Sequence, residues 1–158
     1  MNGHPAPMIR EGAHWYACRI YYEDTDAAGV VYHGNYLGLA ERARTEALRA
    51  LDVPHAEMTR QFGLLFMVRR ANLDYLAPAR LDDSLVVRTR VLAIGAATVA
   101  LRQSFHREQE PERTLVVAEI QLACVRKGDM RPARIPPRWR EQLARLAGVD
   151  GQKGVREG

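Results

Sequence analysis

Apolar side chains recur at helical spacing over one long stretch in the first third of the chain. Between Tyr36 and Leu51 they fall three and four positions apart, and charged side chains fill many of the positions between them. This spacing places the apolar residues on one face of an α-helix. Pro54 follows, so we expect the helix to end before it, with a short second helical turn over 55–62. The pattern predicts one long helix with a buried face.

Elsewhere the pattern changes to the two-residue period of strands. Five stretches rich in apolar and branched side chains predict strands, and they cover residues 14–22, 64–76, 84–94, 96–106 and 113–126. We therefore expect an α+β fold, in which a five-stranded antiparallel sheet wraps around one long central helix. A single helix covers only one face of such a sheet. The other face of the sheet must be exposed to solvent or covered by another element, and a symmetric dimer would cover it.

The length of 158 residues suits one domain with a well-packed core. We divide the chain into a flexible N-terminus over 1–13, a folded domain over 14–130 and a basic, proline-containing tail over 131–158, in which Trp139 is a candidate anchor. The composition, 47% hydrophobic and 27% charged, excludes a disordered chain. The sequence has neither an apolar run long enough to span a membrane nor the start of a signal peptide, so we expect a cytoplasmic protein.

The net charge of +4 comes from one segment. Residues 126–145 hold seven arginines and lysines against Asp129 and Glu141, and the rest of the chain is close to neutral. A localised basic segment suggests an acidic partner, such as phosphates or an acidic carrier protein, and we expect no nucleic-acid partner. A solvated surface without a partner is the alternative. Cys18 and Cys124 lie far apart in strand-like stretches and are expected to be buried thiols.

The residues best suited to chemistry lie between the first predicted strand and the long helix. Asp24 and Asp26 precede His33 and the start of the helix, where unpaired backbone N–H groups carry partial positive charge. Such a place can stabilise an oxyanion while a carboxylate acts as base or nucleophile. The alternative is a loop whose acidic residues and Asn35 merely cap the helix. A calcium loop is excluded, because Ala28 and Asn35 stand where it needs acidic ligands, and no other histidine has metal-ligand spacing.

The positions around these residues form one dense motif. They are Tyr22, Glu23, Asp24, Thr25, Asp26, Gly29, Val30, Val31, Tyr32, His33, Asn35, Tyr36 and Leu37, followed by Glu41, Arg42, Ala43 and Arg44. The motif resembles the signature of the 4-hydroxybenzoyl-CoA thioesterase family, and most closely its branch of acyl-CoA thioesterases associated with the bacterial Tol–Pal system. This resemblance implies a hotdog fold, a homodimer with active sites at the subunit interface, and a homotetramer as a frequent further assembly. It also implies an acyl-CoA substrate and no separate cofactor, because coenzyme A is part of the substrate.

The resemblance assigns roles within the motif. Asp26 is implied to be the catalytic carboxylate, and Asp24 its loop-shaping neighbour. The backbone N–H of His33 would polarise the thioester carbonyl, and the His33 imidazole is expected to contribute as well. Gly29 would let the thioester approach the backbone closely.

Three further residues of the motif, Tyr22, Val31 and Tyr32, are expected to bind substrate. Tyr22 would line the pocket or hold the catalytic carboxylate, and packing in the core is the alternative for it. Gly34 departs from the motif, because close relatives often carry alanine there. Glu41 and Glu46 on the helix are expected to form salt bridges at the surface or at an interface.

The resemblance implies an acyl-CoA thioesterase that hydrolyses a small or medium acyl thioester, aliphatic or aromatic, to the free acid and coenzyme A. Direct attack by Asp26 and general-base activation of a water both suit a carboxylate beside a thioester carbonyl. Two other functions fit the same fold. One is a hydratase or dehydratase acting on an acyl thioester, and the other is a non-catalytic protein that binds an acyl carrier protein or a membrane complex.

Overall fold

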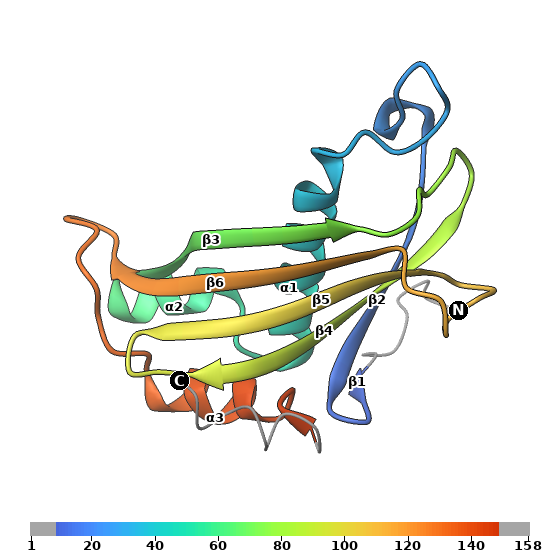
Figure 1. Cartoon of the computed structure of the whole chain (residues 1–158). Helices are drawn as coiled ribbons and strands as arrows, with labels where there is room; N and C mark the ends of the chain where they lie inside the picture. Colours follow the sequence, from blue (N-terminus) through green and yellow to red (C-terminus); the bar gives the residue numbers. More distant parts are fainter. Residues whose placement is uncertain (1–8, 149–158) are drawn as a thin grey trace, which may run out of the picture.

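A single antiparallel sheet with the strand order β1-β2-β4-β5-β6-β3 wraps around the long helix α1 (Figure 1). The computed structural model describes residues 9–148. The strands are β1 (Ile9–Arg10), β2 (Ala13–Arg19), β3 (Leu64–Tyr75), β4 (Ser84–Ile94), β5 (Thr98–Arg107) and β6 (Val116–Arg126). The helices are α1 (Asn35–Ala50), α2 (His55–Phe62) and α3 (Pro137–Ala144), and a short 3-10 helix, η1, covers Tyr22–Asp24. The predicted α+β arrangement of an antiparallel sheet around a long helix is confirmed.

Helix α1 buries the face that its spacing predicts. Its buried residues are Tyr36, Leu39, Ala40, Ala43, Ala47 and Leu48. The alanines allow the helix to lie close to the sheet, and the Tyr36 ring meets Phe105 of β5 edge-on with ring centroids 5.3 Å apart. The helix ends where Asp52 adopts a left-handed φ of 63° and the N–H of Val53 donates to the carbonyl of Leu48 at 2.9 Å. This packing fixes the N-terminal end of α1 beside the loop that follows β2.

The prediction of five strands was wrong, because the sheet contains a sixth strand. Ile9 and Arg10 lie in the segment assigned to the flexible N-terminus, but they pair with β2 as strand β1. The turn between the two strands uses Glu11 and Gly12, whose φ angles of 54° and 69° are both left-handed. A strand of two residues is too short for its period to be recognised in the sequence.

The first predicted strand was also too long. Residues up to Tyr22 have the aromatic and branched side chains of a strand, but β2 ends at Arg19. The Asp24 carboxylate accepts a hydrogen bond from the backbone N–H of Tyr21 at 2.9 Å, and this contact turns the chain into η1. A local side-chain contact therefore overrides β-propensity here.

The second helical turn expected over 55–62 is confirmed as α2, and a further helix, α3, packs on the same core. Trp139 of α3 is 1% exposed and meets Phe62 of α2 edge-on, with ring centroids 5.9 Å apart. Leu143 and Leu146 are also buried, and the N–H of Val91 in β4 donates to the carbonyl of Leu146 at 2.9 Å. The folded part therefore continues past the boundary expected at residue 130, whereas residues 149–158 of the expected tail lie outside the described residues.

The basic segment is largely paired within the chain. Its internal contacts are Arg126 with Asp129, Arg138 with Asp52, Arg140 with the carbonyl of Gly95, and Arg145 with Gln142. The side chains of Lys127, Arg131 and Arg134 have no hydrogen-bond or ion-pair partner within residues 9–148. Within residues 9–148, these three are the cations of the basic segment that keep no internal partner.

The turn between β1 and β2 lies against the segment after α3. A Cβ atom added to Gly12 would lie 2.2 Å from the Cα of Gly148, and the residue has a left-handed φ. We expect Gly12→Ala to lower the free energy of unfolding by about 1–3 kcal/mol, because both the backbone and the contact must distort. Gly128→Ala is the matched control, since no heavy atom lies within 4 Å of its added Cβ. Equal stabilities of the two variants in urea denaturation would contradict this account.

The sheet face turned away from α1 carries polar side chains. Arg102 of β5 and Glu119 of β6 form an ion pair across it at 2.7 Å, with both side chains about half exposed. Arg10 and Arg88 lie over the Trp15 ring at 4.6 and 5.6 Å from its centroid. This face can therefore remain exposed to solvent, and it does not by itself require a second copy of the chain to cover it.

His106 is buried on this outer face and gives stability a pH dependence. Its Nδ1 lies 3.1 Å from the carbonyl oxygen of Arg113, and its Nε2 lies 2.8 Å from the Ser104 hydroxyl. Burial lowers the pKa of His106; the hydrogen bond to Arg113 opposes this, and the nearby Arg88 cation adds to it. Below the ordinary histidine pKa of 6.5, the unfolded chain therefore binds a proton that the native chain does not. The free energy of unfolding consequently decreases as the pH decreases.

We expect the free energy of unfolding to decrease between pH 7.5 and 5.5, by no more than about 1.4 kcal/mol per pH unit for each proton involved. His106→Gln keeps hydrogen-bonding capacity without a titrating group, so its urea denaturation should show a smaller decrease over the same range. An unchanged pH dependence in this variant would show that His106 is not responsible. Burial also lowers the pKa values of His14 and His55. These two residues would account for the pH dependence of stability that remains in the His106→Gln variant.

Candidate active site

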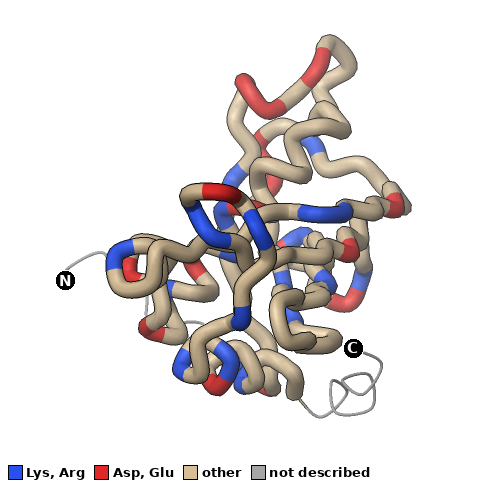
Figure 2. The backbone as a smooth tube through the Cα atoms, turned by 90° about the vertical axis from the view of Figure 1, so that its left-hand side faces the viewer, with Lys and Arg blue, Asp and Glu red and all other residues tan. Residues whose placement is uncertain are grey.

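The loop between β2 and α1 is held in one shape by hydrogen bonds within it. It stands clear of the body of the molecule and carries acidic but no basic positions (Figure 2). The carbonyl of Asp24 accepts from the backbone N–H of Tyr32 at 3.0 Å and from Nδ2 of Asn35 at 2.9 Å. The backbone carbonyl of Asp24 therefore links the two ends of the loop, and the loop-shaping role of its side chain stays a prediction.

Asp26 lies at the base of a tight turn within this loop. Its backbone N–H donates to the carbonyl of Val30 at 2.9 Å, and the N–H of Gly29 donates to the carbonyl of Asp26 at 3.0 Å. Gly29 has a φ of 80°, which explains why glycine stands here. One carboxylate oxygen of Asp26 accepts from the N–H of Ala28 at 2.8 Å. The exposed carboxylate of Asp26 is thus fixed in position by the backbone of its own turn.

The start of α1 has backbone donors that its own side chains do not cap. Gly34 is the N-cap residue and no side chain caps the helix. Within the described part of the chain, the N–H groups of His33 and Gly34 donate to no acceptor. Asn35 is already helical and donates to the loop, so the alternative in which the loop merely caps the helix is wrong. These amides lie at the positive end of a 16-residue helix, which favours a developing negative charge.

A cavity of about 340 Å³ brings the predicted catalytic residues together. Its lining residues are Asp26, Val30, Val31, His33, Tyr36, Tyr75, Leu76, Ala77 and Pro78. The hydroxyl of Tyr75 donates to the backbone carbonyl of His33 at 3.2 Å, and its ring meets the His33 ring edge-on at 6.3 Å between centroids. The end of β3 therefore holds the start of α1 in place.

The predicted substrate-binding residues divide into two groups. Val31 lines the cavity, and its N–H donates to the carbonyl of Ala79 at 2.8 Å. Tyr22, Gly29 and Tyr32 do not line it in the described protomer. Tyr22 is 81% exposed, so it neither packs in the core nor lines this cavity. Its position at the start of η1 directs its side chain to solvent.

Gly34, the departure from the family motif, has a local physical reason. A Cβ atom added there would lie 2.8 Å from Cε2 of the Tyr32 ring. The Tyr32 ring lies beside that of His33, with centroids 4.4 Å apart. Alanine at this position would therefore require the Tyr32 ring to move away from its present place.

Sequence reasoning missed the wall of the cavity that follows β3. Tyr75 is the last residue of β3, and Leu76, Ala77 and Pro78 follow it in the connection to β4, about forty residues after His33. Tyr36 was expected only in the core, but its hydroxyl also accepts from the N–H of Ala79 at 3.2 Å. The aromatic residue and the proline after a strand are the only local signals of this wall.

Other side chains that could take part in a reaction lie away from this cavity or are poorly reactive. Burial raises the pKa of the Cys18 thiol to about 11, so it stays protonated and is a poor nucleophile. Glu46 pairs with Arg49 on the surface of α1, as expected, whereas Glu41 forms no ion pair within residues 9–148. No group of three or more metal-ligating side chains is found in the described part of the chain.

No helix of the described part is long and apolar enough to cross a membrane.

The chain with this fold belongs to a known class of protein. A model of the thioesterase superfamily matches residues 28–114, more than half of the chain, and the chain therefore belongs to that family. The matched stretch includes His33 and begins two residues after Asp26. The resemblance drawn from the motif is confirmed at the level of the family.

Individual relatives are similar over most of the chain. The chain is 42% identical to the acyl-CoA thioesterase YbgC of Haemophilus influenzae over 120 residues, which are 75% of this chain and 85% of that protein. It is 40% identical to the acyl-CoA thioester hydrolase YbgC of Escherichia coli O6:H1, over 75% of this chain and 86% of that one. A 1,4-dihydroxy-2-naphthoyl-CoA thioesterase from Synechocystis shares the fold, with a TM-score of 0.76 and 22% identity, over 83% of this chain and 95% of that one.

Proposed function

We propose that the chain hydrolyses small or medium acyl-CoA thioesters, aliphatic or aromatic, to the free acid and coenzyme A, with Asp26 as the catalytic carboxylate. The observation that carries this proposal is that Asp26 and His33 line one cavity at the start of α1. The similarity to two proteins named as acyl-CoA thioesterase and thioester hydrolase supports the same chemistry.

The start of α1 supplies the second requirement of this reaction. The carbonyl oxygen of a thioester becomes negatively charged when the acyl carbon is attacked. The uncapped N–H groups of His33 and Gly34 can donate to that oxygen, and one good donor of this kind is worth about 3 kcal/mol in the transition state. The exposed imidazole of His33 is then free to orient a water or to protonate the departing thiolate.

Two routes suit this arrangement. In the first, Asp26 takes a proton from a water whose oxygen bonds to the acyl carbon, and the C–S bond breaks. In the second, an Asp26 oxygen bonds to the acyl carbon, the thiolate leaves, and water hydrolyses the mixed anhydride. A single turnover in ¹⁸O-labelled water identifies the second route if the label enters Asp26, which requires water to attack the Asp26 carboxyl carbon of the anhydride. Trapping of an acylated Asp26 by rapid quenching identifies that route when water attacks the acyl carbon instead, because the label then enters the product acid in both routes.

Thiol release tests the proposed function directly. A colorimetric thiol reagent would be used with a panel of short, medium and aromatic acyl-CoAs and with matching acyl carrier protein thioesters. We expect release of coenzyme A from at least one acyl-CoA of the panel. A change at the acyl chain without thiol release would instead identify a hydratase or dehydratase. Binding without either reaction would identify a non-catalytic binding protein.

A second copy of the chain is proposed to pair along β3. This strand of 12 residues forms one edge of the sheet, with β6 as its only partner in the described part of the chain. Met67, Val68, Tyr75 and Leu76 are exposed on or just after it, although such edges are usually protected. The cavity beside Tyr75 would then lie close to the subunit interface. Sedimentation velocity should give the mass of two or four chains, and the mass of one chain would overturn this proposal.

A further inference from the structure

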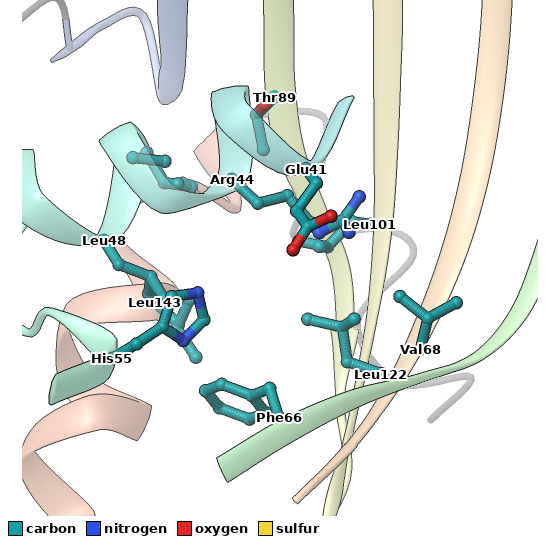
Figure 3. A pocket seen from close by; sticks show the side chains of 12 residues that line it. Glu41, Arg44, Leu48, His55, Phe66, Val68, Thr89, Leu101, Leu122 and Leu143 are labelled. Atoms are coloured by element: carbon teal, nitrogen blue, oxygen red, sulfur yellow. The ribbon is translucent and has the colours of Figure 1, made fainter. Parts of the chain in front are cut away.

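A second cavity lies deeper along α1, between the helix and the sheet (Figure 3). It measures about 190 Å³, and its apolar wall includes Leu48, Phe66, Leu101, Leu122, Leu143 and Leu146. It shares no lining residue with the cavity of Asp26 and His33. Arg44, which lines it, lies eight residues beyond Tyr36, or about 12 Å further along the helix axis at 1.5 Å per residue. The two cavities are therefore separate in the protomer.

The charged end of this cavity is a partly buried cation. Arg44 donates to Oε1 of Gln103 at 3.0 Å, and Gln103, which is fully buried, donates to the Thr89 hydroxyl and to the carbonyl of Ala40, both at 3.0 Å. The only hydrogen-bond partner of the Arg44 guanidinium in the described part of the chain is thus a neutral amide. A guanidinium has five N–H donors, so it can bind a carboxylate while keeping this contact.

Two other titratable groups, Glu41 and His55, line this cavity. Figure 3 shows Glu41 beside Arg44, and His55 projecting toward Phe66 at the other end. Glu41 is exposed and does not reach ion-pair distance of Arg44 in the described contacts. Burial lowers the pKa values of Arg44 and His55, and the Arg44 charge lowers that of His55 further. A bound anion would therefore meet one fixed cation and one competing carboxylate.

We propose that this cavity is a second ligand site, which binds the anion of a medium-chain carboxylic acid. The carboxylate would accept hydrogen bonds from Arg44, and the hydrocarbon chain would lie against the leucines and Phe66. An apolar cavity with one convergent charged group suits an amphipathic ligand of this kind. The choice of ligand rests on the proposed function in one respect, because hydrolysis of a medium acyl thioester releases this class of acid.

Isothermal titration calorimetry with sodium octanoate tests the site without any turnover. We expect one octanoate to bind per chain. Arg44→Met should weaken binding about tenfold or more, because it removes the charged donor. Glu41→Gln should instead tighten binding severalfold, because it removes the competing carboxylate. Arg42→Met, an exposed position on the same helix, is the matched control and should leave binding unchanged. Equal affinities of wild type, Arg44→Met and Glu41→Gln would overturn the proposal.

Two alanine-to-leucine variants identify which cavity is occupied. Ala47 lines the second cavity and Ala77 lines the first. We expect Ala47→Leu to abolish octanoate binding and Ala77→Leu to retain it, with thermal unfolding to verify that both variants are folded. The reverse result would place octanoate beside Asp26 and overturn the second site. Octylammonium should bind at least about tenfold more weakly than octanoate, and equal binding would contradict recognition by Arg44. Because binding needs no hydrolysis, failure of this proposal is distinguishable from failure of the proposed function.

Discussion

Asp26→Asn is expected to lower kcat for thioester hydrolysis by about 10²- to 10⁴-fold. The substitution is nearly isosteric, so its side-chain oxygen can still accept the N–H of Ala28 and the turn should keep its shape. What is lost is the negative charge, which either attacks the acyl carbon or takes the proton of water. Thiol release under saturating acyl-CoA measures kcat, and KM should change far less because the lining of the cavity is unaltered.

Asp24→Asn supplies the control for this prediction. It is the same change two residues away, and its oxygen can still accept the N–H of Tyr21, so the loop should persist. We expect Asp24→Asn to retain most of the wild-type kcat. If both variants lost activity equally, the loop shape rather than the charge of Asp26 would be responsible. If Asp26→Asn were fully active, Asp26 would not be the catalytic carboxylate.

Trp139→Ala is expected to lower the free energy of unfolding by about 3–5 kcal/mol. The indole is 1% exposed and lies between α3 and the rest of the core, with Phe62 of α2 packed edge-on against it. Its removal leaves a cavity that neighbouring side chains can fill only in part. For a chain of this size the melting temperature should fall by roughly 10 °C, measured at one protein concentration because assembly also affects it.

Arg138→Ala tests whether the effect belongs to burial rather than to α3 as a whole. Arg138 is adjacent to Trp139 but exposed, and it pairs with Asp52 at 2.8 Å with the two side chains 49% and 90% exposed. Such exposed pairs contribute no more than about 1 kcal/mol. A loss from Arg138→Ala as large as that from Trp139→Ala would contradict the packing account.

The parts of the fold with a clear period were predictable from the sequence. Strand β4 has the predicted bounds, and α1 begins and ends within one residue of the apolar stretch. Both elements are long, and each has one buried face, so the period is repeated often enough to be recognised. Strand β1 was not predicted, because it is too short, and helix α3 was expected only as a short helical tail without bounds, because its sequence is rich in arginine and proline. The burial of Trp139 depends on α2 and β4, which are distant in sequence.

The candidate site divides in the same way. Asp26 and His33 lie in one continuous segment, and their pairing in one cavity followed from the motif. Tyr75 and Pro78 reach the same cavity through the sheet, because the end of β3 lies beside the start of α1. Tyr22 lies outside the cavity of the single chain, because the strand expected to include it ends at Arg19. Local sequence predicts which residues carry the chemistry, and tertiary contacts decide which residues enclose it.

The position of α3 has a consequence for the chain while it is being synthesised. Trp139, Leu143 and Leu146 leave the ribosome after every strand of the sheet, yet they complete the core beside α2 and β4. Until then the nascent chain presents apolar surface that has no partner of its own. We therefore expect the last step of folding to follow synthesis of α3, and the preceding intermediate to be a substrate for chaperones and proteases. A messenger RNA truncated before the codon for residue 137 would yield a protein that has the complete motif but lacks α3, so that part of its core would be exposed to solvent.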